Sequence, residues 1–177
     1  MKEITVHTQP FPKEQIEEIL RKNGIQTNHY AEEYFAHPAF TTEEAEDFTV
    51  RILSLRELGF AEGATLPQIF SRLPQEHLKP CPANTGLFLR LAWKEQPSSQ
   101  DAVLSRHAAP DAAVTVLSEP LERDDAFPKG LYLRNVEGTL WLRGYICDAE
   151  YCFPPDAMFA MMKQRGYENE QTGWKRH

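Results

Sequence analysis

The sequence predicts an α+β fold, in which an N-terminal helical section packs on an antiparallel sheet of about four strands and a helix closes the C-terminal end. Apolar residues recur at helical spacing before residue 80 and mostly alternate after it. The 177 residues, 41% hydrophobic and 25% charged, suit one globular domain. We expect a single domain over 1–177: mostly helical over 1–80, mostly β over 81–166, with a frayed polar tail over 167–177.

The N-terminal region predicts one strand and two helices. Apolar and polar residues alternate over 4–6, which indicates a short strand. A helix is expected between Pro12, which suits the first helical position, and Gly24, which suits the residue after a helix. Asn28 is placed to cap a second, short helix that ends before Pro38.

Two more helices are predicted before residue 80. Thr41 and Glu44 have the spacing of a capping box, which predicts a helix from Thr41 to Gly59. Apolar residues follow at helical spacing: Ala45, Phe48, Ile52 and Leu55. A shorter helix is expected from Thr65 to Leu73.

The second half predicts strands and a closing helix. Leucines alternate along residues 87–93, which indicates a strand with an apolar face. A second strand is expected around Val114 and Val116. A last helix is expected after Pro155, carrying Met158, Phe159 and Met162.

A hairpin over residues 130–146 is the strongest β signal. We expect residues 135–138 to form its loop, with Gly138 supplying a positive φ. This loop pairs Arg134 with Thr139. The apolar aliphatic side chains then lie on one face of the hairpin, and the aromatic and arginine side chains lie on the other. The side chains expected to face the core are Leu131, Leu133, Leu140, Leu142 and Ile146.

The outer face of this hairpin is the candidate binding site. Its residues are Tyr132, Arg134, Trp141, Arg143 and Tyr145, and Phe88 and Arg90 join them if the 87–93 strand lies alongside. Aromatic rings and guanidinium groups together favour anions, flat ligands and protein partners. The alternative is that the N-terminal helices cover this face and their acidic residues pair with the arginines.

The leading functional hypothesis is a non-catalytic binding or interaction protein that uses this face, for a protein partner or a small anionic or aromatic ligand. A small hydrolase using His107 with Asp111 or Asp124 is the enzymatic alternative, although the chain lacks a Gly-x-Ser-x-Gly elbow. A nucleic-acid accessory protein is the third class. The net charge of −7 disfavours it, because nucleic acids require a basic face.

The sequence predicts no cofactor and no metal. Cys147 and Cys152 lack the second pair of ligands that a structural zinc site needs. Cys81, between Pro80 and Pro82, resembles the Cys-Pro dipeptide of haem-sensing segments, but this dipeptide is unspecific and a rigid connection explains the prolines well. Neither a Walker loop nor a Gly-x-Gly-x-x-Gly sequence occurs.

A cytoplasmic location is expected. The three cysteines do not form a disulfide framework, and the first residues have no signal-peptide pattern. No apolar run approaches the length of a membrane span. The segment from Lys129 to Tyr145 is similar to small bacterial proteins without an assigned activity, and this resemblance implies a bacterial, cytoplasmic origin only.

Overall fold

An eight-stranded mixed sheet organises the residues that the structure describes, 1–99 and 112–166. In this computed structural model the strands are, in spatial order, β1 (Lys2–His7), β3 (Asp47–Ser54), β10 (Met158–Lys163), β6 (Val114–Val116), β7 (Gly130–Val136), β8 (Thr139–Tyr145) and β2 (Ile25–Thr27), with β5 (Leu78–Lys79) paired to β10. The pairs β6–β10 and β2–β8 are parallel, and the other pairs are antiparallel. The expected small, purely antiparallel sheet is therefore wrong.

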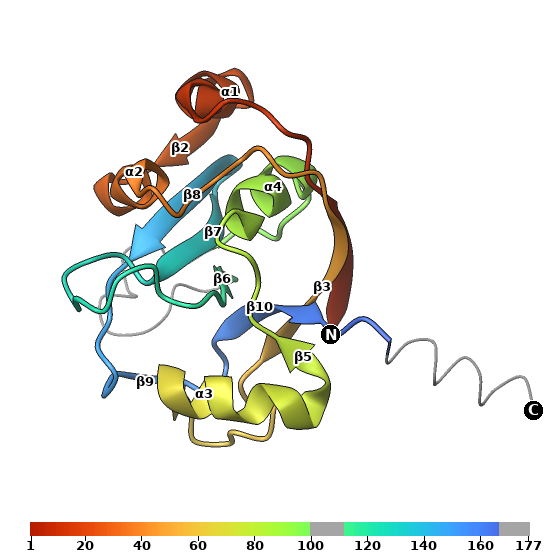
Figure 1. The fold of residues 1–177 in the computed structure, drawn as a ribbon. Helices are drawn as coiled ribbons and strands as arrows, with labels where there is room; N and C mark the ends of the chain where they lie inside the picture. The colour runs from red at the N-terminus through yellow and green to blue at the C-terminus, as the bar shows by residue number, and fades with distance from the viewer. Residues whose placement is uncertain (100–111, 167–177) are drawn as a thin grey trace, which may run out of the picture.

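The helices are short and lie on both sides of this sheet. They are α1 (Ile16–Lys22) after the 3-10 turn η1 (Lys13–Gln15), α2 (His29–Ala36), α3 (Leu66–Arg72) followed by the 3-10 turn η2 (Leu73–Glu76), and α4 (Thr85–Ala92). The sheet curves into half of a barrel around α4, while α3 lies at the opposite side, near a small second sheet of β4 (Ala64–Thr65) and β9 (Cys152–Phe153) (Figure 1).

Several local predictions are confirmed. β1 and β6 lie where the alternating residues placed strands. Gly24 follows α1 with a φ of +69°, a conformation that glycine adopts easily. The Asn28 side chain caps α2. Thr65 and Gln68 form a complete capping box at the start of α3.

The helix predicted over residues 41–59 is wrong, because its central part is strand β3. Phe48, Val50 and Ile52 alternate with exposed or half-buried residues and enter one core. Phe48 and Ile52 also lie four residues apart, so their spacing fits a helix as well. The β-branched residues and the central position between β1 and β10 decide for the strand.

The strand predicted over residues 87–93 is also wrong, because the segment forms helix α4. Every residue from Thr85 to Arg90 is buried. Leu87, Leu89 and Leu91 lie two residues apart, so their spacing fits a strand as well as a helix that is buried on most of its surface. The alternation of leucines along it was a coincidence of composition.

The closing helix predicted after Pro155 is wrong, because this segment is strand β10. Phe159, Ala160 and Met161 are buried in succession. A central strand that is covered on both faces reads as a continuous apolar run, and Met and Ala favour helices in isolation. Pairing with β3 and β6 overrides that preference.

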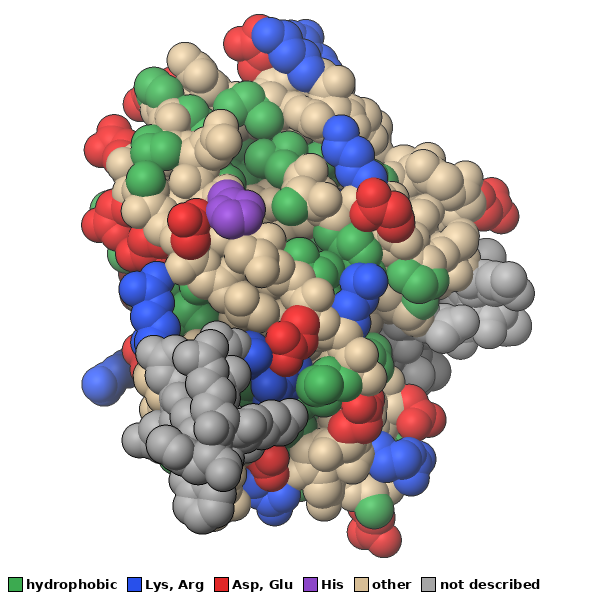
Figure 2. All heavy atoms as spheres, turned by 90° about the vertical axis from the view of Figure 1, so that its right-hand side faces the viewer, with side chains coloured by type: hydrophobic (Ala, Val, Ile, Leu, Met, Phe, Trp, Pro, Cys, Tyr) green, Lys and Arg blue, Asp and Glu red, His purple; other side chains and the backbone are tan. Residues whose placement is uncertain are grey.

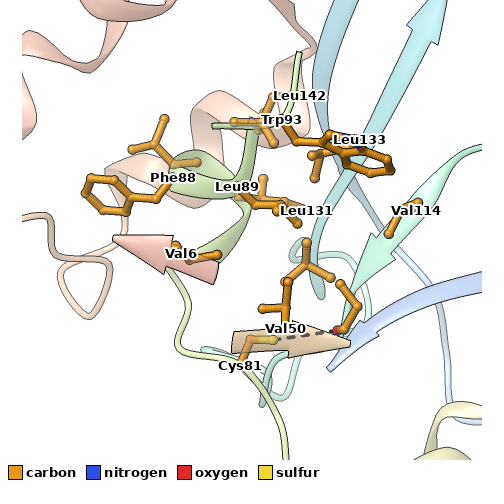
Figure 3. Packing of buried hydrophobic residues seen from close by; sticks show 14 of the residues in the cluster. Val6, Val50, Cys81, Phe88, Leu89, Trp93, Val114, Leu131, Leu133 and Leu142 are labelled. Atoms are coloured by element: carbon orange, nitrogen blue, oxygen red, sulfur yellow. Dashed lines mark hydrogen bonds between the residues drawn. The ribbon is translucent and has the colours of Figure 1, made fainter. Parts of the chain in front are cut away.

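The sheet separates two clusters of buried side chains. The first core lies inside the curve, where α4 and the hairpin β7–β8 contribute Phe88, Leu89, Leu131, Leu133 and Leu142. Figure 3 shows Leu89 of α4 beside Leu131 of the hairpin, while Phe88 extends from the side of α4 that is turned away from the hairpin. The second core lies on the outer side under α3 and contains Leu55, Ile69, Leu73, Leu117 and Phe159.

The hairpin over β7 and β8 is confirmed, although its register differs from the predicted one by two residues. Val136 pairs with Thr139, and Arg134 pairs with Trp141. Glu137 and Gly138 form the turn, with φ values of +51° and +91°, as a type I′ turn requires. Because side chains alternate with a period of two, the shift leaves the residues of β7 and β8 on their predicted faces. Ile146, which follows β8 and was expected to face the core, is instead 43% exposed.

Candidate functional site

Helix α2 does not cover the outer face of the hairpin, although Tyr145 on this face packs against the second core under α3. A Cβ placed on Gly144 would lie 2.6 Å from the backbone of Tyr30 in α2, and one on Gly86 of α4 would lie 2.9 Å from Leu131. Gly144 and Leu131 pair with each other and share the leucine side of the sheet. Helices α2 and α4 therefore cover the leucines, and the alternative that α2 covers the rings is wrong.

Arg143 connects the aromatic side chains of this outer face. Its guanidinium carbon lies 5.1 Å from the centre of the Trp141 ring, a cation–π distance. Its Nε donates a 2.8 Å hydrogen bond to the Tyr132 hydroxyl. Because the hydroxyl oxygen accepts this bond, its own proton is still available for donation. Tyr132 in turn meets the Tyr145 ring edge-on, with 6.5 Å between centroids.

Arg134 is held by the segment that runs beside β7. Its Nη2 donates to the Ser99 hydroxyl at 3.3 Å. The Ser99 backbone N–H donates to the carbonyl of Asn135, and the Asn135 amide donates to the carbonyl of Gln96. Residues 96–99 thus pair with the part of β7 that extends past the end of β6. The Arg134 side chain contacts this segment through Ser99.

The prediction that Arg90 joins this face is wrong. Arg90 lies on α4 and is fully buried. Its guanidinium donates to the Gln96 side chain at 2.5 Å, to the carbonyl of Trp93, and to the carbonyls of Arg134 and Trp141 at 3.4 Å. Burial lowers the pKa of Arg90 to about 10, so it stays charged at neutral pH. Arg90 therefore connects the end of α4 to the hairpin from the core side.

A cavity of about 480 Å³ opens at the tyrosine end of the outer face. Its aromatic wall consists of Tyr132 and Tyr145 from the hairpin and Tyr151 and Phe153 from the chain that follows it. Tyr151 and Phe153 meet edge-on, with 4.8 Å between ring centroids. We call this cavity the tyrosine pocket.

The remaining wall of the tyrosine pocket is partly apolar and partly acidic. Met158, Ile146, Cys147 and Thr115 contribute to it, together with the carboxylates of Asp125 and Asp148. Asp148 Oδ1 accepts hydrogen bonds from the backbone N–H groups of Glu150 and Tyr151, at 2.9 and 2.8 Å. These bonds hold the Asp148 carboxylate against the backbone of residues 150–151.

Asp125 has a cationic neighbour. The buried Lys129 ammonium lies 3.5 Å from the Asp125 carboxylate and donates to the carbonyl of Asp124 at 3.3 Å. The carboxylates of Asp125 and Asp148 and the side chain of Cys147 also line an adjoining hollow of about 510 Å³, beside Phe70 of α3. The two carboxylates therefore lie at a border between two hollows.

The hydroxyl groups of Tyr145 and Tyr151 and the thiol of Cys147 remain uncharged at neutral pH. Burial raises the pKa of Tyr145 and, to a smaller extent, the pKa of Tyr151. Burial, followed by the nearby Asp148 carboxylate, raises the pKa of Cys147 to about 11. Thiols react as thiolates, so Cys147 is a weak nucleophile at neutral pH and contributes polarisable surface instead.

Of the six predicted site residues, only Tyr132 and Tyr145 line the pocket. Arg134, Trp141 and Arg143 share their face but are not part of the pocket wall. Sequence reasoning missed Asp148, Tyr151 and Phe153, because it assigned no structure to the segment after the hairpin. The density of aromatic residues in that segment, Tyr145 to Phe153, was the available signal.

The alternative sites have different outcomes. His107 and Asp111 of the hydrolase hypothesis lie outside the described residues. Asp124 lies in a loop, where its carboxylate accepts the backbone N–H of Ala126. Cys81 is buried in the first core, where its thiol donates to the carbonyl of Ala160 (Figure 3). Over 1–99 and 112–166, no three His, Cys, Asp or Glu side chains gather as metal ligands.

The surface adds little to the nucleic-acid hypothesis. On the side that Figure 2 presents, acidic and basic side chains of the described residues are interspersed. Several basic residues are already paired, as Arg51 and Lys163 are with Glu3.

In the described parts of the chain, no helix has the length and apolar character needed to cross a membrane. Comparison with protein-family models, curated proteins and solved structures finds no match to this chain.

Proposed function

We propose that this chain is a cytoplasmic, non-catalytic binding protein whose ligand is small, flat and mostly apolar and enters the tyrosine pocket. The observation that carries the proposal is the pocket itself: four aromatic rings around a cavity of about 480 Å³. Ligand sites commonly have volumes of about 300–1,000 Å³ and consist of apolar walls with a few polar groups. The tyrosine pocket matches this description in size and in composition.

The rings also favour a flat ligand over a branched one. Aromatic pairs prefer edge-on or offset contacts, with about 4.5–7 Å between centroids. Tyr132 and Tyr145 on one side, and Tyr151 and Phe153 on the other, already contact each other at such distances. A planar ligand extends this pattern by adding one more ring.

An anionic ligand, which the arginines of the outer face suggested, is less well supported. Arg143 is engaged by Trp141 and Tyr132, and Arg134 is engaged by Ser99. Neither guanidinium lines the pocket. A protein partner would have to use the half-buried Trp141 and Arg143, which offer less concave surface than the pocket does.

Indole is a suitable first probe, and the methionine methyl groups report where it binds. Met158 lines the tyrosine pocket, whereas Met161 is buried in the second core and Met162 lines a separate hollow beside Cys81. In a protein labelled with ¹³C at its methionine methyls, indole should shift the Met158 resonance through its ring current. The expected Kd for such a small ligand is on the order of 1 mM or below.

Tyr151→Ala tests the site, because the Tyr151 side chain is 41% exposed and its loss should not unfold the protein. This variant should weaken the indole-dependent shift of Met158 severalfold. Phe60→Ala is the matched control, since Phe60 stacks with Arg72 beside a different hollow. Equal shifts of Met158, Met161 and Met162, or an unchanged affinity in Tyr151→Ala, would overturn the proposal.

A further inference from the structure

The charged side chains that line the tyrosine pocket all have the same sign. Asp125 and Asp148 contribute carboxylates, and the pocket wall among the described residues contains no Lys or Arg side chain. Lys129, which lies against Asp125, lines the adjoining hollow instead. It offsets part of the charge of Asp125, whereas Asp148 accepts only neutral backbone N–H groups. The nearest cation on the other side is Arg143, which donates to the Tyr132 hydroxyl from outside the pocket wall. Among the charges that line the pocket, that of Asp148 is therefore the least compensated.

The aromatic rings of the pocket wall also favour a positive charge. The face of an aromatic ring is the negative end of its quadrupole and attracts cations within about 6 Å of the centroid. Tyr132, Tyr145 and Tyr151 surround the cavity. Since burial keeps the phenols of Tyr145 and Tyr151 protonated, their rings attract cations and their hydroxyls remain available as neutral hydrogen-bond partners.

Building on the proposed function, we propose that the natural ligand carries a positive charge: a flat aromatic amine or amidine whose cationic group lies beside Asp148. Its ring contacts Tyr145 and Tyr151, and its charged nitrogen faces the border with the adjoining hollow. This placement avoids the main penalty of burying a charge, because the two carboxylates at that border are exposed and water remains near the nitrogen.

The position of the Asp148 carboxylate favours this role. Two hydrogen bonds to the backbone of Glu150 and Tyr151 hold one of its oxygens. A carboxylate that is already oriented loses little side-chain entropy when a cation binds. The same two bonds place the carboxylate and the Tyr151 ring on one short segment, so a single cation can contact both.

Three compounds of nearly equal shape separate charge from shape: benzamidine, benzamide and benzoate, which are cationic, neutral and anionic at pH 7. The Met158 methyl shift provides the affinity of each. Benzamidine should bind at least about fivefold more tightly than benzamide, and benzoate should bind most weakly, as expected for one partly exposed ion pair with added cation–π attraction. Raising the salt concentration should reduce the advantage of benzamidine only.

Asp148→Asn removes the charge but keeps an oxygen that can accept the two backbone N–H groups. In this variant the affinity for benzamidine should fall to within about twofold of that for benzamide, because only the ion pair is lost. Asp156→Asn is the matched control: it removes the same charge from a side chain that is 84% exposed and paired with Arg56 outside the pocket. It should leave the preference for benzamidine unchanged.

The outcomes distinguish this inference from the proposed function. Binding of benzamide or benzoate as tight as that of benzamidine would overturn the charge preference and leave the pocket as a binding site. An equal loss in Asp148→Asn and Asp156→Asn would overturn the role of Asp148, since it would show an effect of net charge alone. If none of the three compounds nor indole shifts Met158, the proposed function itself fails.

Discussion

The side chain of Asn28 pairs with the backbone of Gly144 as though it were one more residue of strand β2. Asn28 Nδ2 donates to the Gly144 carbonyl at 3.0 Å, and the Gly144 N–H donates to Asn28 Oδ1 at 2.8 Å. The same Oδ1 accepts the N–H of Ala31 at 2.9 Å and so caps α2. One amide therefore continues the parallel pairing of β2 with β8 and begins the helix.

Asn28→Ala should lower the free energy of unfolding by about 2–4 kcal/mol, since it removes a helix cap and two part-buried hydrogen bonds. Urea denaturation measures the change. Asn28→Ser keeps a cap for α2 but cannot reach both groups of Gly144, so its loss should be intermediate. A Ser variant as unstable as the Ala variant would show that the cap contributes nothing.

Gly144 allows the close approach of α2 to β8. A Cβ at this position would lie 2.6 Å from the Tyr30 carbonyl carbon and 2.8 Å from its oxygen. Both are backbone atoms and cannot rotate away, so Gly144→Ala must displace the helix. We expect a loss of about 1–3 kcal/mol, the usual cost of overpacking. Thr139→Ala, an exposed change on the same strand, is the control, and equal midpoints for the two variants would contradict the prediction.

The hairpin shows what the sequence could establish. The faces of Leu133 and Trp141 were predicted correctly even though the register was not, because a shift of two residues preserves alternation. The two-residue turn at Glu137 and Gly138 was missed, since Glu rarely adopts the positive φ that it has here. The alternation of side chains was therefore enough to predict the two faces of this hairpin. Its register depends on the type of turn, which was predicted incorrectly.

The segments that sequence reasoning misassigned are those whose neighbours come from distant parts of the chain. β3 and β10 pair with each other across about a hundred residues of sequence, and each has another strand on its far side. α4 is enclosed by that sheet and is buried on every side. The tyrosine pocket could not be predicted for the same reason, because the pairing of β10 with β6 and of β6 with β7 brings Phe153 and Tyr132 to one cavity.

Arg90 should be irreplaceable by Lys or Met. Its guanidinium donates to the Gln96 side chain and to carbonyls from both the α4 end and the hairpin. Lys has one compact ammonium and cannot bridge acceptors from separate segments, and Met leaves them all unpaired. Each buried acceptor left unpaired costs about 1–3 kcal/mol, so both variants should lose at least about 3 kcal/mol by urea denaturation. A Met variant as stable as the parent protein would show that the Arg90 charge and its hydrogen bonds contribute no net stability.

Cys81 should make the protein less stable at alkaline pH. Burial raises the pKa of Cys81 from 9.0 to about 12 in the folded state. Above pH 9 the unfolded chain therefore loses this proton while the folded protein keeps it, so stability falls as the pH rises from 9 to 12. The slope for one such group is at most about 1.4 kcal/mol per pH unit.

The melting temperature measured between pH 8 and 10.5 tests this prediction. It should fall less steeply in Cys81→Ala than in the parent protein, whatever the Ala variant loses at pH 8. Cys152→Ala, at an exposed cysteine, is the control and should keep the parent slope. Identical slopes in all three proteins would show that the Cys81 thiol does not contribute.

Arg143 should act on the tyrosine pocket without touching the ligand. Its Nε holds the Tyr132 hydroxyl oxygen, and its guanidinium is itself fixed over Trp141. Arg143→Met keeps much of the side-chain bulk but releases Tyr132, so the affinity for indole should fall about 2–10-fold, the equivalent of one hydrogen bond. Arg51→Met, which removes a guanidinium bonded to Glu3 on a distant strand, should leave that affinity unchanged. If Arg143→Met binds indole as the parent protein does, Tyr132 is held in place by packing alone, and the part of the outer face around Trp141 has no influence on the pocket.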